Sequence, residues 1–577
     1  MLKKLMQSIR EYKTASILAP ITVTLEVIME TIIPYVMALL IDEGIEVGDM
    51  NAVLQYGVIL LVCCIFALAF GTLAGYYAAY AASGFAKNLR HDMFYHVQTF
   101  SFSNIDKFTP ASIVTRMTTD VTNLQNAYEQ IIRVALRSPL MLIFSLIMSF
   151  VYSPKLTLIF VIAVPILAVG LIAISMKTHP IFMEVFDTYD TLNNVTQENL
   201  HGIRVVKSYV REDYEVKKFS KISEKIYKGF SKAEKRMALN MPIMLFAMYG
   251  CTLLLSWFGS HMIIDGELTT GAFLSLNTYS LQILSSLMML SMIFVMVTMS
   301  RASGDRIVAI LDEESDIQSP KENPVTTVKD GSVDMENVSF SYAKRMDKCC
   351  LNNIDLHIPS GMTVGILGGT GSSKSSLVQL IPRLYDVTEG SVKVGGVDVR
   401  DYDVETLRNE VAMVLQKNVL FSGTIKENLR WGDPDATDEQ LVHACQLACA
   451  DEFIEAFPDK YDTYVEQGGT NLSGGQKQRL CIARALLKHP KILILDDSTS
   501  AVDTHTDAMI RKAFREEIPG TTKFIIAQRV TSVMDADKII VLDEGQINGV
   551  GTHDELMASN AIYREVYESQ QKGSVPL

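Results

Sequence analysis

Six long apolar segments occupy the first 300 residues, and each is long enough to cross a bilayer as a helix. A helix satisfies its backbone hydrogen bonds internally, so segments of this length restrict the first half of the chain to a helical membrane domain. We predict six spans, near residues 16–41, 53–83, 131–152, 156–176, 240–263 and 270–300.

The connections between these segments alternate in length. The second and fourth are long, polar and helix-like, and cover about 84–130 and 177–239, whereas the other three are short. The long connections are rich in Lys and Arg, so the positive-inside rule places them in the cytoplasm and the short acidic ones outside. Both chain ends are then expected in the cytoplasm. The basic, amphipathic N-terminus predicts an interfacial helix that leads into the membrane, not a signal peptide.

Composition narrows the possible functions. The 577 residues are 48% apolar and carry a net charge of −13, which gives no electrostatic support to nucleic-acid binding. The eight cysteines include no Cys-x-x-Cys pair, and we interpret them as reduced thiols. A polar linker near residues 312–324 separates two expected domains: a membrane α-helical domain with six spans, over 1–320, and an α/β P-loop ATPase domain, over 330–577.

Two features of the spans suggest a substrate site, and each has a simpler explanation. Glu26 and Glu30 lie four residues apart on one face of the first span, where they could attract cationic substrates or serve in hydrogen bonds between helices. A methionine stripe at helical spacing in the last span could fit apolar ligands or contact lipid and neighbouring helices. It consists of Met288, Met292 and Met296.

A strand-like run at 363–367 leads into a glycine-rich loop and then into a helical pattern, which is the context of a phosphate-binding P-loop. Main-chain N–H groups of such a loop face phosphates. We expect Lys374 to reach the β- and γ-phosphates of ATP, and the Ser375 hydroxyl to ligate Mg²⁺. The predicted nucleotide-binding residues of the loop are Gly368, Gly369, Thr370, Gly371, Ser372, Ser373, Lys374, Ser375 and Ser376.

The segment Leu472-Ser-Gly-Gly-Gln476 is followed, about twenty residues after it begins, by the apolar strand that ends in Asp496. Together with the P-loop, these motifs resemble the nucleotide-binding domain of an ABC transporter. The resemblance implies ATP and Mg²⁺ as cofactors. It further implies an adenine-stacking ring, a glutamine that senses Mg²⁺, a carboxylate that holds Mg²⁺ through water, and a D-loop aspartate. These are Tyr342, Gln416, Asp496 and Asp503.

Three positions depart from the family pattern. Ser373 stands where a glycine precedes the P-loop lysine, and we expect it to weaken or alter nucleotide binding. Asp497 replaces the catalytic glutamate and is shorter by roughly 1.5 Å, and a shift of about 1 Å can cost on the order of a hundredfold in rate. Gln528 replaces the switch histidine and cannot carry a proton. The resemblance therefore predicts an impaired hydrolytic site.

The signature segment is intact, and the resemblance explains why. In this family two nucleotide-binding domains close head to tail, so Ser473, Gly475 and Gln476 would act on the site of a partner chain. The whole sequence resembles the degenerate-site subunit of bacterial heterodimeric multidrug exporters. The segments 104–120 and 198–209 are similar to their coupling-helix regions.

This resemblance implies an ATP-hydrolysing translocase that works as a complex in the lipid bilayer of the bacterial cytoplasmic membrane. The partner would be a second, non-identical half-transporter that carries the catalytic Glu and His, and the substrate an amphiphilic small molecule. Two alternatives remain: an ATP-gated regulatory or channel-like module, and an exporter of narrow specificity for lipid or peptide. Vesicle accumulation driven by ATP would separate a pump from a gate.

Overall fold

The computed structural model describes residues 2–572, and the chain divides into two compact units. The first ends at Thr99 and resumes over Thr109–Glu313; the second comprises Phe100–Phe108 and the chain from Glu314 onward. The segment Phe100–Phe108 therefore packs with the second unit although the first surrounds it in sequence. The division into functional domains at 1–320 and 330–577 stays a prediction.

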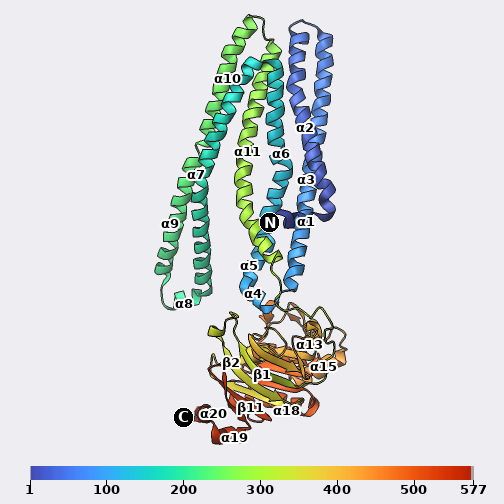
Figure 1. Ribbon diagram of the computed structural model, residues 1–577, viewed down its shortest axis with the longest axis vertical. Coiled ribbons are helices and arrows are strands. Elements are labelled where there is room, and N and C mark those ends of the chain that lie inside the picture. The colour runs from blue at the N-terminus through green and yellow to red at the C-terminus, as the bar shows by residue number, and fades with distance from the viewer. Residues whose placement is uncertain (1, 573–577) are drawn as a thin grey trace. The chain divides into compact units, whose positions relative to one another are not determined.

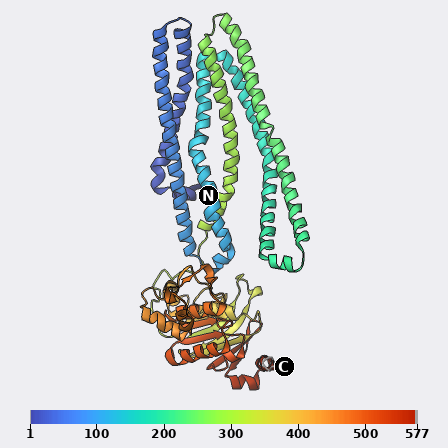
Figure 2. The same ribbon diagram turned by 180° about the vertical axis from the view of Figure 1, so that it is seen from behind.

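The first unit is helical (Figures 1 and 2). Its α-helices are α1 (Leu2–Gln7), α2 (Lys13–Leu39), α3 (Met50–Gln98), α5 (Pro110–Thr115), α6 (Val121–Tyr152), α7 (Pro154–His201), α8 (Ile203–Ser208), α9 (Glu212–Met237), α10 (Asn240–Ile264) and α11 (Thr270–Leu311). Shorter helical segments are η1 (Arg10–Tyr12), η2 (Leu40–Ile45) and η3 (Arg116–Asp120).

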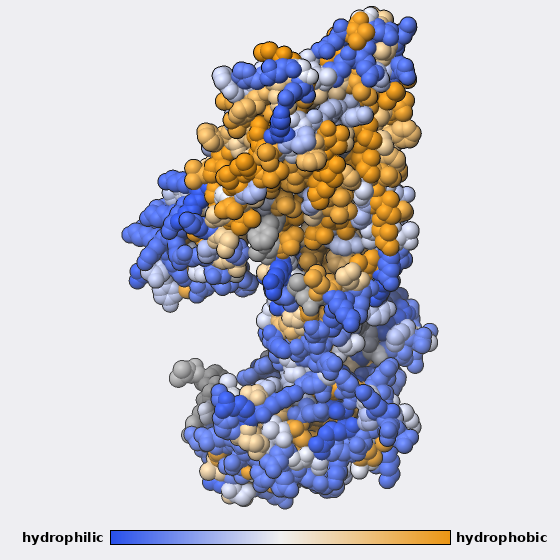
Figure 3. All heavy atoms as spheres, turned by 45° about the horizontal axis from the view of Figure 1, so that its top comes forward, coloured by the Kyte–Doolittle hydropathy of each residue, from blue (hydrophilic) through white to orange (hydrophobic). Residues whose placement is uncertain are grey.

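Six stretches of the described chain are long and apolar enough to cross a membrane, which confirms the predicted six-span domain. They are Arg10–Ile45, Met50–Gln98, Pro110–Tyr152, Pro154–His201, Glu212–Ile264 and Thr270–Ile293. Figure 3 shows that apolar side chains gather on the outer surface of the long helices, as lipid contact requires. The two long connections are helical as expected, and contain α5, α8, α9 and a further helix, α4 (Phe102–Phe108).

The turn between α6 and α7 shows how the sequence sets these boundaries. Ser153 caps α7, and its side chain accepts a hydrogen bond from the Leu156 N–H at 3.3 Å. Pro154 occupies the first helical position, where no N–H is needed. The resulting tight reversal brings α6 and α7 together, and a core that includes Phe160 and Leu276 joins α7, α10 and α11.

The second unit is an α/β domain. Its strands are β1 (Val333–Phe340), β2 (Leu351–Ile358), β3 (Thr363–Gly368), β4 (Glu389–Val394), β5 (Val397–Asp398), β6 (Val411–Val414), β7 (Gly423–Thr424), β8 (Tyr464–Val465), β9 (Ile492–Asp496), β10 (Thr522–Ile526), β11 (Lys538–Asp543) and β12 (Gln546–Gly551). Its α-helices are α4 (Phe102–Phe108), α12 (Lys374–Gln379), α13 (Val404–Glu410), α14 (Ile425–Leu429), α15 (Asp438–Leu447), α16 (Asp451–Glu455), α17 (Gly474–Leu486), α18 (Thr504–Glu517), α19 (His553–Ser559) and α20 (Ala561–Lys572).

The main sheet has the strand order β12-β11-β3-β10-β9-β6, and a second sheet has the order β2-β1-β4-β5. Strands β11, β3, β10, β9 and β6 run parallel, and only the edge strand β12 is antiparallel to its neighbour. Parallel strands end at one edge of a sheet, and ligands of such folds bind beyond that edge. The loops that follow β3, β10, β9 and β6 therefore converge.

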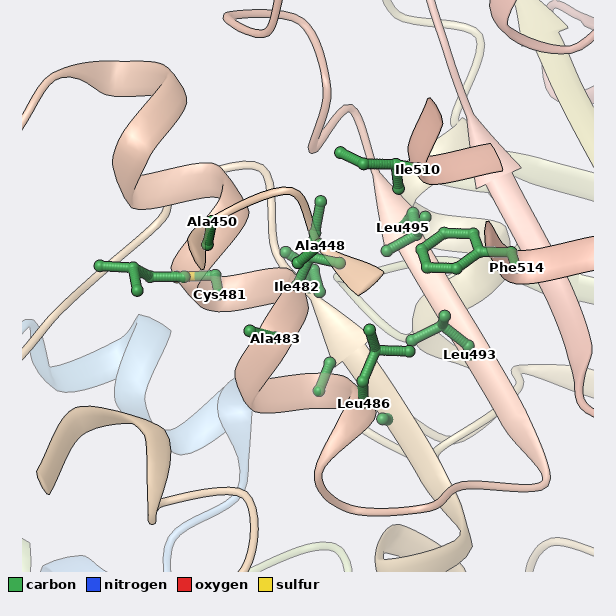
Figure 4. Packing of buried hydrophobic residues seen from close by; sticks show 14 of the residues in the cluster. Ala448, Ala450, Cys481, Ile482, Ala483, Leu486, Leu493, Leu495, Ile510 and Phe514 are labelled. Carbon is green, nitrogen blue, oxygen red and sulfur yellow. The ribbon is translucent and has the colours of Figure 1, made fainter. Parts of the chain in front are cut away.

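A buried apolar core fixes the strands and helices that carry these loops. Figure 4 shows Leu493 and Leu495 of β9 among Ile482 and Leu486 of α17 and Phe514 of α18. Each of these side chains is at least nine-tenths buried. Burial of this kind stabilises by roughly 1.5–3 kcal/mol per large side chain, so the end of β9 is held firmly against α17 and α18.

Candidate functional site

The P-loop connects the end of β3 to α12. Lys374 Nζ donates hydrogen bonds to the carbonyl oxygens of Gly368 and Gly369, each at 2.8 Å. A side chain at Gly368 has no room, since its Cβ would lie 2.3 Å from the Leu542 carbonyl oxygen. Burial lowers the pKa of Lys374, and the nearby carboxylates of Asp497 and Asp496 oppose this shift. The lysine thus lies inside the loop beside two acidic groups.

Ser373, one of the three departures, has left-handed backbone geometry, with φ of 68° and ψ of 27°. This region costs a residue with a Cβ about 1–2 kcal/mol relative to ordinary helical geometry. Ser373 makes no side-chain hydrogen bond that caps α12. The loop retains a conformation suited to glycine although the glycine itself is gone.

The two expected Mg²⁺ ligands contact each other. Ser375 Oγ donates to Asp496 Oδ1 at 2.9 Å, and Asp496 is 3% exposed. Burial raises the pKa of Asp496 and the Asp497 carboxylate raises it further, whereas the Ser375 hydroxyl and Lys374 oppose the rise. Among the described residues there is no group of three or more His, Cys, Asp or Glu side chains that could hold a metal. One carboxylate and one hydroxyl instead suit a Mg²⁺ ion held largely by phosphate oxygens.

Asp497 is held by Gln528 and lies near a second glutamine. Gln528, which follows β10, donates from Nε2 to Asp497 Oδ2 at 2.9 Å, and the Gln416 amide, which follows β6, is close enough to lower the pKa of Asp497. Burial raises the pKa of Asp497, and the two amides together with Lys374 and Arg529 oppose the rise. Asp497 also has positive φ, at 50°. The structure therefore brings both altered hydrolytic positions into direct contact.

Tyr342 lies just beyond β1 and is half-exposed, with a relative accessibility of 51%. Its hydroxyl lies 2.8 Å from Ser376 Oγ, and its ring packs edge-on against Tyr385 at 5.1 Å between centroids. Tyr385 donates from its hydroxyl to Asp106 Oδ2 of α4 at 2.8 Å, and Phe102 of α4 packs on the Tyr385 ring. Tyr385 could not be predicted as part of this group, because no local sequence pattern pairs it with Asp106.

The signature residues form a separate group at the start of α17. Ser473 and Gln476 make a reciprocal capping box, with Gln476 Oε1 accepting from the Ser473 N–H at 2.8 Å. Gly475 packs against the loop after β9, where an added Cβ would lie 2.8 Å from the Ala501 carbonyl oxygen. Asp503 caps α18 and accepts from the N–H groups of His505 and Thr506.

The predicted site residues thus fall into two sets. Within residues 2–572, no hydrogen bond joins a signature residue to the P-loop. The first set surrounds the P-loop and contains Tyr342, Gly368, Gly369, Thr370, Gly371, Ser372, Ser373, Lys374, Ser375, Ser376, Gln416, Asp496, Asp497 and Gln528. The second contains Ser473, Gly475, Gln476 and Asp503.

The carboxylates of the first span are paired. Arg137 of α6 donates from Nη2 to both oxygens of Glu30, at 2.7 and 2.6 Å, and its Nε lies 3.5 Å from Glu26 Oε1. These contacts support the interhelical interpretation of both glutamates. Arg137 was missed, although a basic residue inside a predicted span is a visible signal. In the methionine stripe, Met288 packs against a core cluster and Met292 is exposed.

Comparisons with known proteins agree with this architecture. Residues 16–287 match the family described as ABC transporter transmembrane region, and residues 351–500 match the family described as ABC transporter. An uncharacterized ABC transporter ATP-binding protein of Bacillus subtilis, YfiB, is 36% identical over 99% of this chain and 98% of its own length. An ATP-dependent lipid A-core flippase of Desulfotalea psychrophila is 32% identical over 84% of each chain. A probable multidrug resistance ABC transporter ATP-binding/permease protein of Bacillus subtilis, YheI, is 34% identical over 84% of this chain and 83% of its own.

Proposed function

The chain belongs to the ABC transporter family, and we propose that it is the hydrolysis-impaired subunit of a heterodimeric exporter. It is an exporter-type half-transporter with a six-span membrane region and an ATPase domain. The observation that carries the proposal is the hydrogen bond from Gln528 to Asp497. It places two groups unsuited to hydrolysis beside each other, next to a P-loop that keeps Lys374 and Ser375.

The P-loop group supports binding of ATP. Lys374 and the main-chain N–H groups of the loop would hold the phosphates, and the exposed face of Tyr342 would stack on adenine. Ser375, Asp496 and Gln416 would hold Mg²⁺, which when bound supplies positive charge against the phosphate oxygens. Asp503, which caps α18, would act near the nucleotide through the loop that precedes this helix.

Hydrolysis at this site is expected to be slow. A catalytic carboxylate must orient or deprotonate the attacking water, but Asp497 is short and already accepts a hydrogen bond from the Gln528 amide. Gln528 can donate a hydrogen bond but cannot supply the charge or proton of an imidazole. Bound ATP at this chain's P-loop would then act mainly as a long-lived clamp between the two ATPase domains.

The signature residues would serve the other site. The capping box orders Ser473 and Gln476 at the start of α17, where main-chain N–H groups and the helix dipole favour an anion. Ser473, Gly475 and Gln476 would contact the ATP bound to a second, non-identical half-transporter that carries the catalytic Glu and His. Turnover there would reset the transport cycle.

The transported molecule is proposed to be an amphiphile. Relatives whose names refer to a lipid A-core flippase and to multidrug resistance align with most of this chain. A narrow lipid exporter is the alternative within the same mechanism, and a substrate panel in sealed vesicles distinguishes the two. We place the protein in the bacterial cytoplasmic membrane, with the ATPase domain, proposed as residues 330–577, on the cytoplasmic side.

The proposal is tested by ATP turnover of the purified chain alone and of the same chain co-expressed with a half-transporter that has Glu and His. We expect little turnover alone and high turnover in the pair. Gln476→Ala should reduce turnover of the pair, whereas Gln446→Ala, at an exposed glutamine of α15, should not. Rapid turnover by the unmodified chain alone would contradict the impaired site.

A further inference from the structure

A cavity of about 410 Å³ lies among α2, α6 and α11 in the first unit. Its wall combines the ion-paired Glu30 and Arg137 with hydroxyl groups and with the apolar side chains of Ile33, Met141 and Met289. These residues all lie in segments that span the membrane. Polar groups are costly there and commonly mark binding sites, so the hydrogen-bonding capacity of the wall determines which ligand fits.

Each hydroxyl group of the wall donates its hydrogen bond to a main-chain carbonyl oxygen of its own helix. Ser138 donates to Val134 at 3.0 Å, Thr278 to Leu274 at 3.1 Å, Ser285 to Gln282 at 3.2 Å and Ser286 to Gln282 at 2.6 Å. A hydroxyl has one proton and two lone pairs, so toward a ligand these four groups act as acceptors.

The amide of Gln282 is engaged at both ends. Its Oε1 accepts from Ser145 Oγ at 2.9 Å, and its Nε2 donates to the Glu30 carbonyl oxygen at 3.5 Å. Its Nε2 has a second N–H, so the amide can offer a ligand one further donor. The carboxylate of Glu30 accepts two hydrogen bonds from Arg137 but has about four lone-pair positions, so it can accept more.

The charged side chains near the cavity are balanced, because Glu26 and Glu30 lie near Arg137 and Arg133. Arg137 serves two carboxylates, and Glu26 Oε2, on a residue only 8% exposed, has no hydrogen-bond partner among the described residues. Arg133, one turn away on α6, points toward α3, where its guanidinium lies 3.6 Å from the position of a Cβ on Gly75. Neither Arg133 nor Glu26 is among the residues that line the cavity. The wall itself therefore holds one carboxylate and one guanidinium and, within residues 2–572, its free acceptors outnumber its free donors, which include the unpaired Nε–H of Arg137.

We propose that this cavity binds the head of a primary or secondary alkylammonium ion, a cation that carries N–H donors. The ammonium would donate to Glu30 and to the serine and threonine lone pairs, and its chain would pack against Ile33, Met141 and Met289. A quaternary ammonium of equal charge lacks the donors and binds less well. This site names a substrate class for the proposed export function, and its role in transport rests on that function.

The test measures binding of two probes to the full-length chain in lipid nanodiscs, without nucleotide. Dodecylammonium and dodecyltrimethylammonium have the same charge and chain length, and empty nanodiscs correct for partition into lipid. One hydrogen bond to a charged group contributes enough for about a tenfold difference in affinity. We expect dodecylammonium to bind at least about tenfold more tightly.

Substitutions in the cavity then show which residues cause the preference for dodecylammonium. Glu30→Gln should remove most of the preference for dodecylammonium. Since this change also removes a partner of Arg137, Thr278→Val provides a second variant, which keeps the side-chain shape and loses an acceptor. Thr72→Val is the matched control, because Thr72 of α3 is exposed and makes the same kind of helix hydrogen bond away from the cavity.

Equal affinities for the two probes would contradict the proposal that this cavity binds the ammonium head. A preference that neither Glu30→Gln nor Thr278→Val reduces would contradict it as well. Since binding is measured without nucleotide, a failure of the impaired-hydrolysis proposal would appear in ATP turnover and leave this result unchanged. Conversely, a normal turnover pattern with equal probe affinities would reject the cavity and retain the proposed export complex.

Discussion

Gln528 Nε2 lies 2.9 Å from Asp497 Oδ2, so the substitutions at two separated sequence positions form one hydrogen-bonded pair. The contact follows from the sheet. Strands β10 and β9 are parallel neighbours in register, with Ile526 opposite Asp496, and their next residues enter the same space beyond the sheet edge. The Asp497 N–H also donates to the Ile526 carbonyl oxygen at 3.1 Å. A substitution at either position therefore changes the surroundings of the other side chain.

Restoring the glutamate and the histidine of the family pattern at positions 497 and 528 should restore ATP hydrolysis at this site. In the chain purified alone, Asp497→Glu combined with Gln528→His should raise ATP turnover by about a hundredfold, because a carboxylate displaced by about 1 Å loses roughly that factor. Either single change should give much less, since Gln528 would still hold the carboxylate or Asp497 would still be short. Gln446→His, on the exposed face of α15, is the control. Unchanged turnover in the double variant would place the defect elsewhere.

Ser373→Gly should stabilise the ATPase domain. The left-handed geometry of Ser373 costs the folded state about 1–2 kcal/mol, which glycine would avoid. Glycine also gives the unfolded chain more conformational freedom, which offsets about 0.4–1 kcal/mol of this gain. We expect a net gain of about 0.5–1 kcal/mol in the free energy of unfolding and tighter ATP binding. Ser422→Gly, at an exposed residue without positive φ, should lose stability instead. Denaturant unfolding measures the stability, and equilibrium binding measures the affinity for ATP. Equal changes in stability in the two variants would show that the backbone at Ser373 is not strained.

Much of the membrane unit and of the P-loop group could be predicted from local sequence. Apolar length sets the spans, and the pattern of strand, glycine-rich loop and helix sets the phosphate-binding loop. The partner of Asp497 could not be predicted in this way, since it depends on which strands are neighbours in the sheet. The contact between Tyr385 and Asp106 joins residues 279 positions apart, and the pairing of Arg137 with Glu30 joins residues 107 apart. Such contacts are set by tertiary packing alone.

The two glycines of the signature segment should respond differently to alanine. At Gly475 an added Cβ would lie 2.8 Å from the Ala501 carbonyl oxygen, whereas at Gly474 it would lie 3.4 Å from the Ala501 Cβ, an ordinary contact. Gly475→Ala must therefore displace the loop after β9 and should cost about 1–3 kcal/mol of stability. We also expect it to lower ATP turnover of the paired complex. Gly474→Ala is the matched control, and equal losses in the two variants would show that the close approach to Ala501 does not decide the outcome.

Tyr385 should link nucleotide binding to α4. It packs against Tyr342 and donates to Asp106, and burial together with the Asp106 carboxylate raises the pKa of its hydroxyl, which therefore stays protonated and remains a donor. A second connection runs from Lys344 through Asp316 to Ser103, near the start of α4. A base stacked on Tyr342 would restrict the motion of Tyr342 and, through Tyr385, that of α4. Phosphates bound in the P-loop would not have this effect.

We therefore expect ATP to slow amide hydrogen exchange in α4 of the full-length chain, and inorganic tripolyphosphate, which lacks the base, to have a smaller effect. Tyr385→Phe keeps the ring but removes the hydrogen bond, and should abolish the difference between the two ligands while the P-loop remains protected. Tyr464→Phe, at an exposed tyrosine of β8, should preserve the difference. If α4 responds equally to ATP and tripolyphosphate in the unmodified chain, the base does not act through Tyr342. If the response to ATP survives in Tyr385→Phe, the ring contact alone transmits it and the hydrogen bond to Asp106 is dispensable.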